Sequence, residues 1–220
     1  MSTRKPVIFC DFDGTITLTD NVVELFKHFR PEGAEEILRR TTTKEMSIRE
    51  GVETLFALMP SSIKPQLVEF IQGQLQIRSG LQELLDFCRT HNVEFLVTSG
   101  GMDFILYPAL EPFGIAPSNI YCNNTDFSGT HIHIHSSHPC DEHCESDCGM
   151  CKSTVMRQYP QEEYYRIMIG DSITDFAGAA FADLIFARSH LEDECRRLQM
   201  PYLPFETFHD VVRQFPVLPD

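Results

Sequence analysis

The chain has 220 residues, 42% of them hydrophobic, so it is long enough for one full domain with an insertion. Its formal net charge of −14 argues against a nucleic acid or an anionic membrane as partner, because either would meet mostly like charge. No apolar run approaches the ~18 residues of a membrane-spanning helix, and the run after Pro6 is too short for a signal peptide. We therefore expect a cytoplasmic protein.

The first predicted element is a buried strand. Residues 7–11 are apolar without alternation, which is typical of a parallel sheet covered on both faces. From 17 to 76 the apolar residues recur at helical spacing, and Thr-rich and Pro/Ser breaks separate the helical stretches. We predict that 17–76 forms a small all-helical cap inserted after the first strand.

Helices and strands alternate after this cap. The sequence predicts helices at 79–92, from about 102, and at 152–159, and buried strands at 93–99, 119–124 and 164–171. Residues 125–137 predict a hairpin with its turn at Ser128-Gly129, and further elements run to "LEDECRRLQ". We therefore predict an α/β fold with a three-layer, Rossmann-like parallel sheet. Its core would comprise 1–16 and 77–220.

Polar residues follow three of the predicted strands at the turn into the next helix. These are Asp11 and Asp13, Thr98 and Ser99, and Asp171 and Asp175. In open α/β sheets, ligands bind in the crevice beyond the carboxyl ends of the strands. Several carboxylates in one crevice, with oxygen atoms as the only ligands, favour Mg²⁺, which commonly binds a substrate phosphate as well. The sequence therefore predicts a site for magnesium and phosphate.

The residues around these acids suit a phosphate ester. Ser99 and the amides of Gly100 and Gly101 can donate hydrogen bonds to phosphate oxygens, and Lys152 can supply a compact positive charge. The two aspartates of "DFDGT" can divide the chemistry. One carboxylate attacks phosphorus and forms an aspartyl-phosphate, while the other protonates the leaving alkoxide and then accepts a proton from water.

Four segments in this order, "DFDGT", "VTSGG", Lys152 and "GDSITD", resemble the motifs of the haloacid dehalogenase superfamily of phosphatases. The helical insertion resembles the cap of the phosphoserine phosphatase-like branch, and the resemblance covers essentially the whole chain. It implies a Mg²⁺-dependent phosphomonoester hydrolase. It also implies that Asp11 is the nucleophile and Asp13 the acid and base. Mg²⁺ would be held by Asp11, the Asp13 carbonyl and Asp171, with Asp175 nearby but not in direct contact with the ion. Phosphate would be bound by Ser99, Gly100 and Lys152.

The substrate is a small-molecule phosphomonoester on this interpretation. Phosphoserine phosphatases commonly carry Glu where this chain has Asp20, and an arginine in the cap where the segment after Arg49 has none. Asp20 is therefore a candidate specificity residue. The start "FCDFDGTIT", the compact cap, the His-rich hairpin and "CESDCGMCK" resemble instead the phosphatases of methionine salvage that act on 2-hydroxy-3-keto-5-methylthiopentenyl-1-phosphate. Phosphoserine or another phosphomonoester is the alternative.

Four of the eight cysteines crowd into one segment: Cys140, Cys144, Cys148 and Cys151. Three interpretations stay open. The segment binds a structural Zn²⁺, it is a reduced loop that delivers Lys152 to phosphate, or it forms a redox disulfide that moves Lys152. A zinc-bearing interaction module on a degenerate phosphatase fold is a distant alternative, which the four intact motifs disfavour. The sequence leaves the oligomeric state open.

Overall fold

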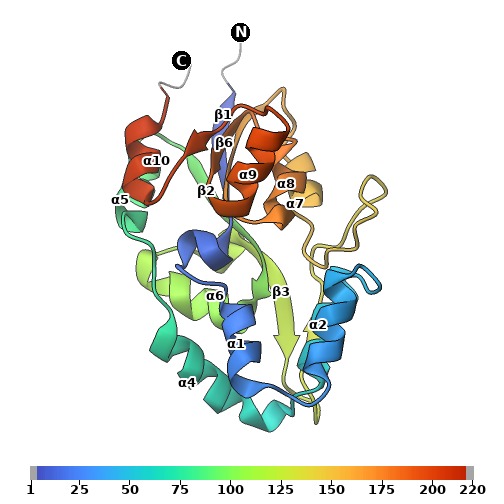
Figure 1. Ribbon diagram of the computed structural model, residues 1–220. Coiled ribbons are helices and arrows are strands. Elements are labelled where there is room, and N and C mark those ends of the chain that lie inside the picture. Colours follow the sequence, from blue (N-terminus) through green and yellow to red (C-terminus); the bar gives the residue numbers. More distant parts are fainter. Residues whose placement is uncertain (1–3, 217–220) are drawn as a thin grey trace.

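The computed structural model describes residues 4–216, and within this range seven strands form one sheet (Figure 1). The strand order is β4-β3-β2-β1-β5-β6-β7, and all neighbours are parallel except β4, which runs antiparallel to β3. The predicted α/β fold with a parallel sheet is confirmed. The strands are β1 (Lys5–Cys10), β2 (Glu94–Met102), β3 (Ile120–Asp126), β4 (His133–His135), β5 (Tyr164–Gly170), β6 (Leu184–Ala187) and β7 (Leu203–Pro204).

Apolar side chains cover both faces of the sheet, as the uninterrupted apolar run in β1 predicts. Ile8 and Cys10 pack into one layer and Val7 and Phe9 into the other, and all four are fully buried. One layer contains α5 (Leu81–Thr90), α6 (Asp103–Leu110) and α10 (Phe208–Gln214), and the other contains α7 (Lys152–Arg157), α8 (Ile173–Ala179) and α9 (Ser189–Arg197). Across residues 4–216, none of the helices is both long and apolar enough to span a bilayer.

Four helices lie between β1 and α5 in the sequence: α1 (Asn21–Phe29), α2 (Ala34–Thr42), α3 (Ile48–Ala57) and α4 (Lys64–Gln74). In Figure 1, α1, α2 and α4 occupy the lower half of the view, at the level of β3. The four helices coincide with the helical stretches predicted from the sequence. Phe56 of α3 is fully buried and meets Phe26 edge-to-face at 5.1 Å between ring centroids. It also approaches Phe104 of α6 at 6.4 Å. The apolar faces of these helices continue the hydrophobic core. Because all four helices fall within 17–76, we propose this range as the cap and 1–16 with 77–220 as the core domain.

Several contacts attach the helical segment to the core, and backbone hydrogen bonds make two of these attachments. Its two linkers run side by side, because the amide of Leu18 donates to the carbonyl of Gln76 at 3.0 Å. The hairpin between β3 and β4 makes the second attachment, through Ser61 N to Thr130 O and Ile132 N to Met59 O, both at 3.0 Å. The predicted hairpin is confirmed, but its connection spans 127–132 and is longer than a two-residue turn, because its backbone also binds the segment before α4.

The sequence analysis missed two elements near the C-terminus, β7 and α10. β7 has only two paired residues and ends in proline, so no periodic pattern marks it. The sequence does contain a signal for α10. Thr207 and Asp210 form a capping box at its start, with Thr207 as the capping residue and Asp210 three positions later.

Candidate active site

The first acidic motif turns sharply at the end of β1. Asp11 directly follows the buried strand and is 5% exposed. Gly14 has a φ of +78°, and a Cβ there would lie 2.5 Å from Oδ2 of Asp171. Only glycine allows this approach without strain. The turn is further fixed by Thr15, whose hydroxyl donates to Oδ1 of Asp171 at 2.8 Å. The first and fourth motifs are therefore in direct contact.

Lys152 connects two of the acids. It is the first residue of α7 and is 6% exposed, and its Nζ donates to Oδ1 of Asp11 at 2.6 Å. The same ammonium also forms an ion pair with Asp175. Burial disfavours its charge, but the carboxylates of Asp11 and Asp175 outweigh that cost and raise the pKa of Lys152. Lys152 is thus held charged beside Asp11.

Asp175 shapes the loop that carries Asp171. Its Oδ2 accepts from Asp171 N at 3.0 Å, from Ser172 N at 2.8 Å and from Ser172 Oγ at 3.0 Å. Asp175 is fully buried, and a Cβ on Gly170 would lie 2.5 Å from its Cγ. Because Lys152 and the loop occupy both of its oxygens, Asp175 positions its neighbours.

Asp11, Asp171 and Asp175 form a group that suits a hard divalent cation. One oxygen atom of each lies within 4.8 Å of the others. Burial and the charge of Asp175 raise the pKa of Asp11 well above its ordinary value, and burial raises that of Asp171. The donors are all oxygen, so Mg²⁺ fits. Asp11 and Asp171 are the residues that would hold it; the Asp13 carbonyl stays a prediction.

Asp13 is oriented by the start of α1. Both the backbone amide and the side-chain amide of Asn21 donate to its Oδ1, at 2.9 Å and 2.7 Å. Burial, reinforced by the nearby charge of Asp20, raises the pKa of Asp13 to about 7. Asp13 can therefore hold or release a proton near neutral pH, as an acid and base requires.

The end of β2 brings the third predicted group into the site. Ser99 is 1% exposed, and its Oγ accepts from Gly101 N at 3.0 Å. Asn123 of β3 donates to the carbonyl of Gly100 at 2.8 Å and so fixes the turn. A Cβ on Gly101 would lie 2.9 Å from Oδ2 of Asp13. The small residues after Ser99 therefore allow the second motif to approach the first.

Four residues of the site escaped the sequence analysis: Asn21, Arg78, Asn123 and Arg188. Arg78 and Arg188, far apart in the sequence, both donate to the carbonyl of Gly14, at 2.7 Å and 2.8 Å, and hold the turn. Neither arginine stands in a recognisable sequence motif. Only their contacts in the folded protein show that they belong to the site. Asn21 had a weak signal, since it opens a helix that Asp20 caps by accepting from Val23 N at 2.9 Å.

A family model for the haloacid dehalogenase-like hydrolases matches residues 8–180. The chain belongs to this family. Among its relatives is a protein of Brevibacillus brevis that is 48% identical over 210 residues, covering 96% of this chain and 95% of that protein. A protein of Bacillus cytotoxicus is 46% identical over 205 residues, or 93% of each chain. Both carry the name 2-hydroxy-3-keto-5-methylthiopentenyl-1-phosphate phosphatase.

Solved structures of phosphoserine phosphatases share the fold of this haloacid dehalogenase-like hydrolase. The apo form of one superposes with a TM-score of 0.69 at 15% identity, covering 97% of this chain and all of that one. A phospho-aspartyl intermediate analogue of phosphoserine phosphatase gives a TM-score of 0.67 at 12% identity, with 97% and 100% coverage. The predicted superfamily and its phosphoserine phosphatase-like architecture are confirmed.

Removing the ammonium of Lys152 should destabilise the protein, because Asp11 and Asp175 would lose their shared buried counter-charge. We expect Lys152→Met to lower the free energy of unfolding by about 3–5 kcal/mol in urea titrations. Lys27→Met is the matched control, since Lys27 pairs with Glu24 at the surface and should cost less than about 1 kcal/mol. Equal losses in the two variants would contradict this account of the buried pair.

Mg²⁺ should raise the melting temperature, because it would relieve the repulsion among the buried acids. At about 100 times its dissociation constant, a cation contributes about 2.7 kcal/mol, which corresponds to several degrees. Asp171→Asn should melt no lower than the wild type without Mg²⁺ and should lose most of the Mg²⁺-dependent increase. Differential scanning calorimetry checks both. A full increase in the variant would remove Asp171 from the cation site.

Proposed function

We propose that this hydrolase is a Mg²⁺-dependent phosphatase of methionine salvage that releases phosphate from 2-hydroxy-3-keto-5-methylthiopentenyl-1-phosphate through an aspartyl-phosphate. The observation that carries the proposal is the 48% identity to the Brevibacillus brevis phosphatase, which extends over 96% of this chain. Identity at this level along the whole length includes both the core and the helical segment that covers the site. A complete set of acidic, amide and lysine groups supports it.

The geometry suits attack by Asp11 on phosphorus. Lys152 contacts Oδ1 of Asp11, which leaves the second carboxylate oxygen to form the new bond to phosphorus. As the bond between phosphorus and the ester oxygen breaks, its electron pair moves to that oxygen, which takes the proton of Asp13. Asp11 and Asp171 would hold Mg²⁺, which would supply positive charge for the phosphoryl group. Ser99 and Lys152 would bind phosphoryl oxygens.

Hydrolysis of the aspartyl-phosphate reverses the role of Asp13. The carboxylate of Asp13 accepts a proton from water, whose oxygen attacks phosphorus and releases Asp11 and inorganic phosphate. The pKa of about 7 lets Asp13 serve as acid in the first half-reaction and as base in the second. Asn21 holds the side chain in one orientation through both steps.

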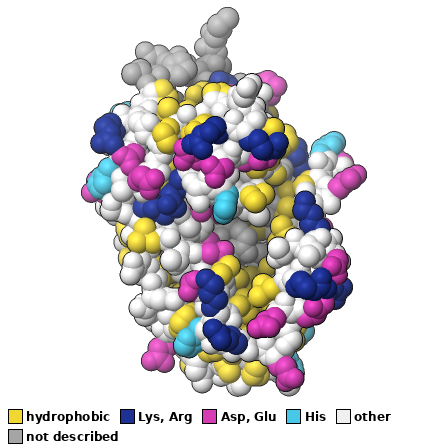
Figure 2. Space-filling view, in the orientation of Figure 1, with side chains coloured by type: hydrophobic (Ala, Val, Ile, Leu, Met, Phe, Trp, Pro, Cys, Tyr) yellow, Lys and Arg dark blue, Asp and Glu magenta, His cyan; other side chains and the backbone are white. Residues whose placement is uncertain are grey.

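An apolar groove beside Asp20 can accept the thioether tail of this substrate. It has a volume of about 890 Å³ and lies between α1, α2 and α3. Figure 2 shows hydrophobic side chains lining a hollow on this face. Asp20 stands at the end of the groove next to Asn21, which suits its predicted role in specificity. The apolar lining consists mainly of Val22, Val23, Phe26, Leu38, Val52 and Leu55.

We also propose a cytoplasmic location, as the sequence indicated. All eight cysteines are free thiols in the structure, including four whose sulfur atoms lie close enough to react with one another. Such a set persists where thiols are kept reduced.

The proposal is tested by phosphate release from a panel of esters that includes the methylthiopentenyl phosphate and phosphoserine. We expect release that EDTA abolishes and Mg²⁺ restores, with a strong preference for the thioether substrate. Asp11→Asn should lower kcat by roughly a thousandfold or more with an unchanged circular dichroism spectrum. Asp86→Asn, an exposed aspartate of α5, is the control. Equal activity on all esters would refute the substrate, and an active Asp11→Asn would refute the mechanism.

A separate prediction concerns the contact between the groove and the thioether tail. We expect Val23→Asn to raise KM for the thioether substrate by about tenfold, because a polar side chain loses the apolar contact with the tail. KM for an ester without the tail should not change. Ile48→Asn is the matched control, because Ile48 has a similar exposure, 39% against 43%, and lies outside the groove. An unchanged KM for both substrates would place the tail elsewhere.

A further inference from the structure

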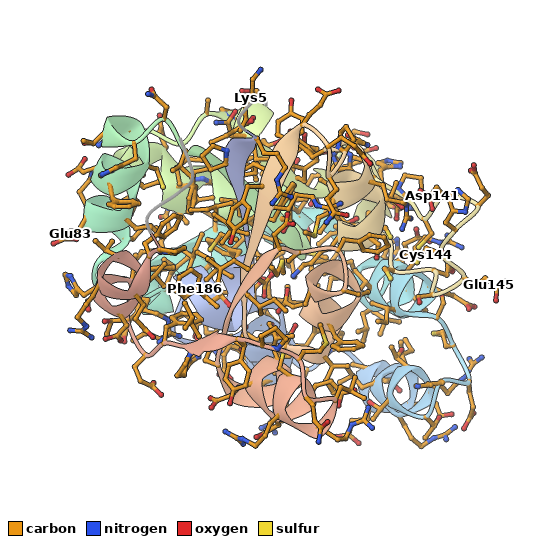
Figure 3. The ribbon with its side chains drawn as sticks, turned by 90° about the horizontal axis from the view of Figure 1, so that it is seen from above. Lys5, Glu83, Asp141, Cys144, Glu145 and Phe186 are labelled. Carbon is orange, nitrogen blue, oxygen red and sulfur yellow. The ribbon has the colours of Figure 1, made fainter. Side chains whose placement is uncertain are left out.

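The loop between β4 and α7 gathers four sulfur atoms at one point. Four Sγ atoms lie within 4.8 Å of one another, those of Cys140, Cys144, Cys148 and Cys151. The other cysteines, Cys10, Cys88, Cys122 and Cys195, are buried in the apolar layers of the core. The four loop thiols therefore form a separate cluster, outside the active site. Figure 3 shows Asp141, Cys144 and Glu145 on this loop, at the edge of the molecule beside the cap helices.

The backbone of the loop bends to bring the thiols together. Asp147 and Gly149 both have positive φ, +47° and +82°, on either side of Cys148. The amide of Cys148 donates to Sγ of Cys140 at 3.4 Å, a bond that strengthens when the sulfur is ionised. Cys151 N donates to His138 O at 2.8 Å and closes the loop. Ordering the loop in this conformation has an entropic cost, and contacts among thiols without a ligand are too weak to offset it.

Polar contacts hold parts of the loop, because Asp141 pairs with Arg157 and Asp147 binds Ser47 and Arg49. None of these contacts brings the four sulfur atoms together. Residues 136–151 contain no helix or strand, and most side chains between 139 and 148 are polar and at least partly exposed. Met150 is one apolar side chain that anchors the loop in the core, at 3% exposed. A long loop of this composition needs a crosslink or a ligand to keep one conformation.

The arrangement discriminates between a metal ion and disulfides. Two disulfides would each join two sulfur atoms and would not require the pairs to approach one another. A tetrahedral ion with Zn–S bonds of ~2.3 Å places every pair of sulfur atoms about 3.8 Å apart, which demands mutual convergence of all four. Four sulfur donors with tetrahedral access favour Zn²⁺ over the oxygen-preferring Mg²⁺. We propose that Cys140, Cys144, Cys148 and Cys151 bind one structural Zn²⁺ as a closed tetrathiolate site.

This site would fix the catalytic lysine and the cap at once. Cys151 immediately precedes Lys152 and caps α7, so an anchored Cys151 sets where that helix begins. Asp147, between two of the cysteines, accepts from Ser47 Oγ at 2.6 Å and from Arg49 Nε at 2.7 Å at the start of α3. The zinc loop thereby positions Lys152 from one side and the cap from the other, without contacting substrate.

The first test is the metal content of the full-length protein, purified without chelator from zinc-containing medium. We expect about one zinc per chain in the wild type and less than about a tenth of that in Cys144→Ser, measured by mass spectrometry of the metal. Glu145→Gln and Asp147→Asn keep all four thiols and should retain the zinc, as should Cys195→Ala, the control for a cysteine outside the cluster. Iron instead of zinc, or zinc retained in Cys144→Ser, would overturn the assignment.

A second measurement does not depend on how the protein was loaded, and its main readout uses the wild type. Reduced, metal-free wild-type protein is titrated with Co²⁺, whose thiolate charge-transfer absorption reports the number of sulfur ligands. We expect saturation at one Co²⁺ with four thiolates and displacement by Zn²⁺, and binding weakened by roughly a hundredfold or more in Cys140→Ser. Mg²⁺ should not compete. A wild type without the charge-transfer band would refute the site. Fewer than eight reactive thiols in wild-type protein purified and unfolded without reductant would also refute it and point to disulfides.

Discussion

The ammonium of Lys152, enclosed between Asp11 and Asp175, is the interaction on which the rest of the site depends. Each partner comes from a different element: Asp11 ends β1, Lys152 starts α7 and Asp175 lies in α8. Three buried charges are tolerable only because they meet in one place. That requirement fixes two helices against the central strand. The acids gathered there offer oxygen donors only, which suits the divalent cation proposed for the site.

Close approach of backbone turns is the second constraint, and it explains the glycines of the motifs. Gly14, Gly101 and Gly170 each stand where a Cβ would lie within 3 Å of a functional carboxylate. The acids can converge because these positions have no side chain. These glycines therefore set how closely the carboxylates approach one another. Replacing any of the three by alanine would displace the carboxylate that faces it.

Much of this could be predicted from the sequence because the signals are local. A short stretch of sequence is enough to recognise each signal. This holds for the apolar run before Asp11, for the four helical stretches and for the individual motifs. The residues that were missed act at long range: Arg78 and Arg188 meet at the carbonyl of Gly14 although 110 positions separate their numbers in the sequence. No periodicity encodes such a meeting. β7 was missed for the opposite reason, since its two residues are too few to form a pattern.

The position of β1 in the sheet has a consequence for how the chain folds. It is the first strand in the sequence but lies in the middle of the sheet, and its register with β5 pairs Lys5 with Tyr164. During synthesis, β1 can pair with β2 once residues 94–97 have emerged, but its other edge must wait for β5. Contacts of such high sequence separation slow folding and leave apolar surface exposed meanwhile.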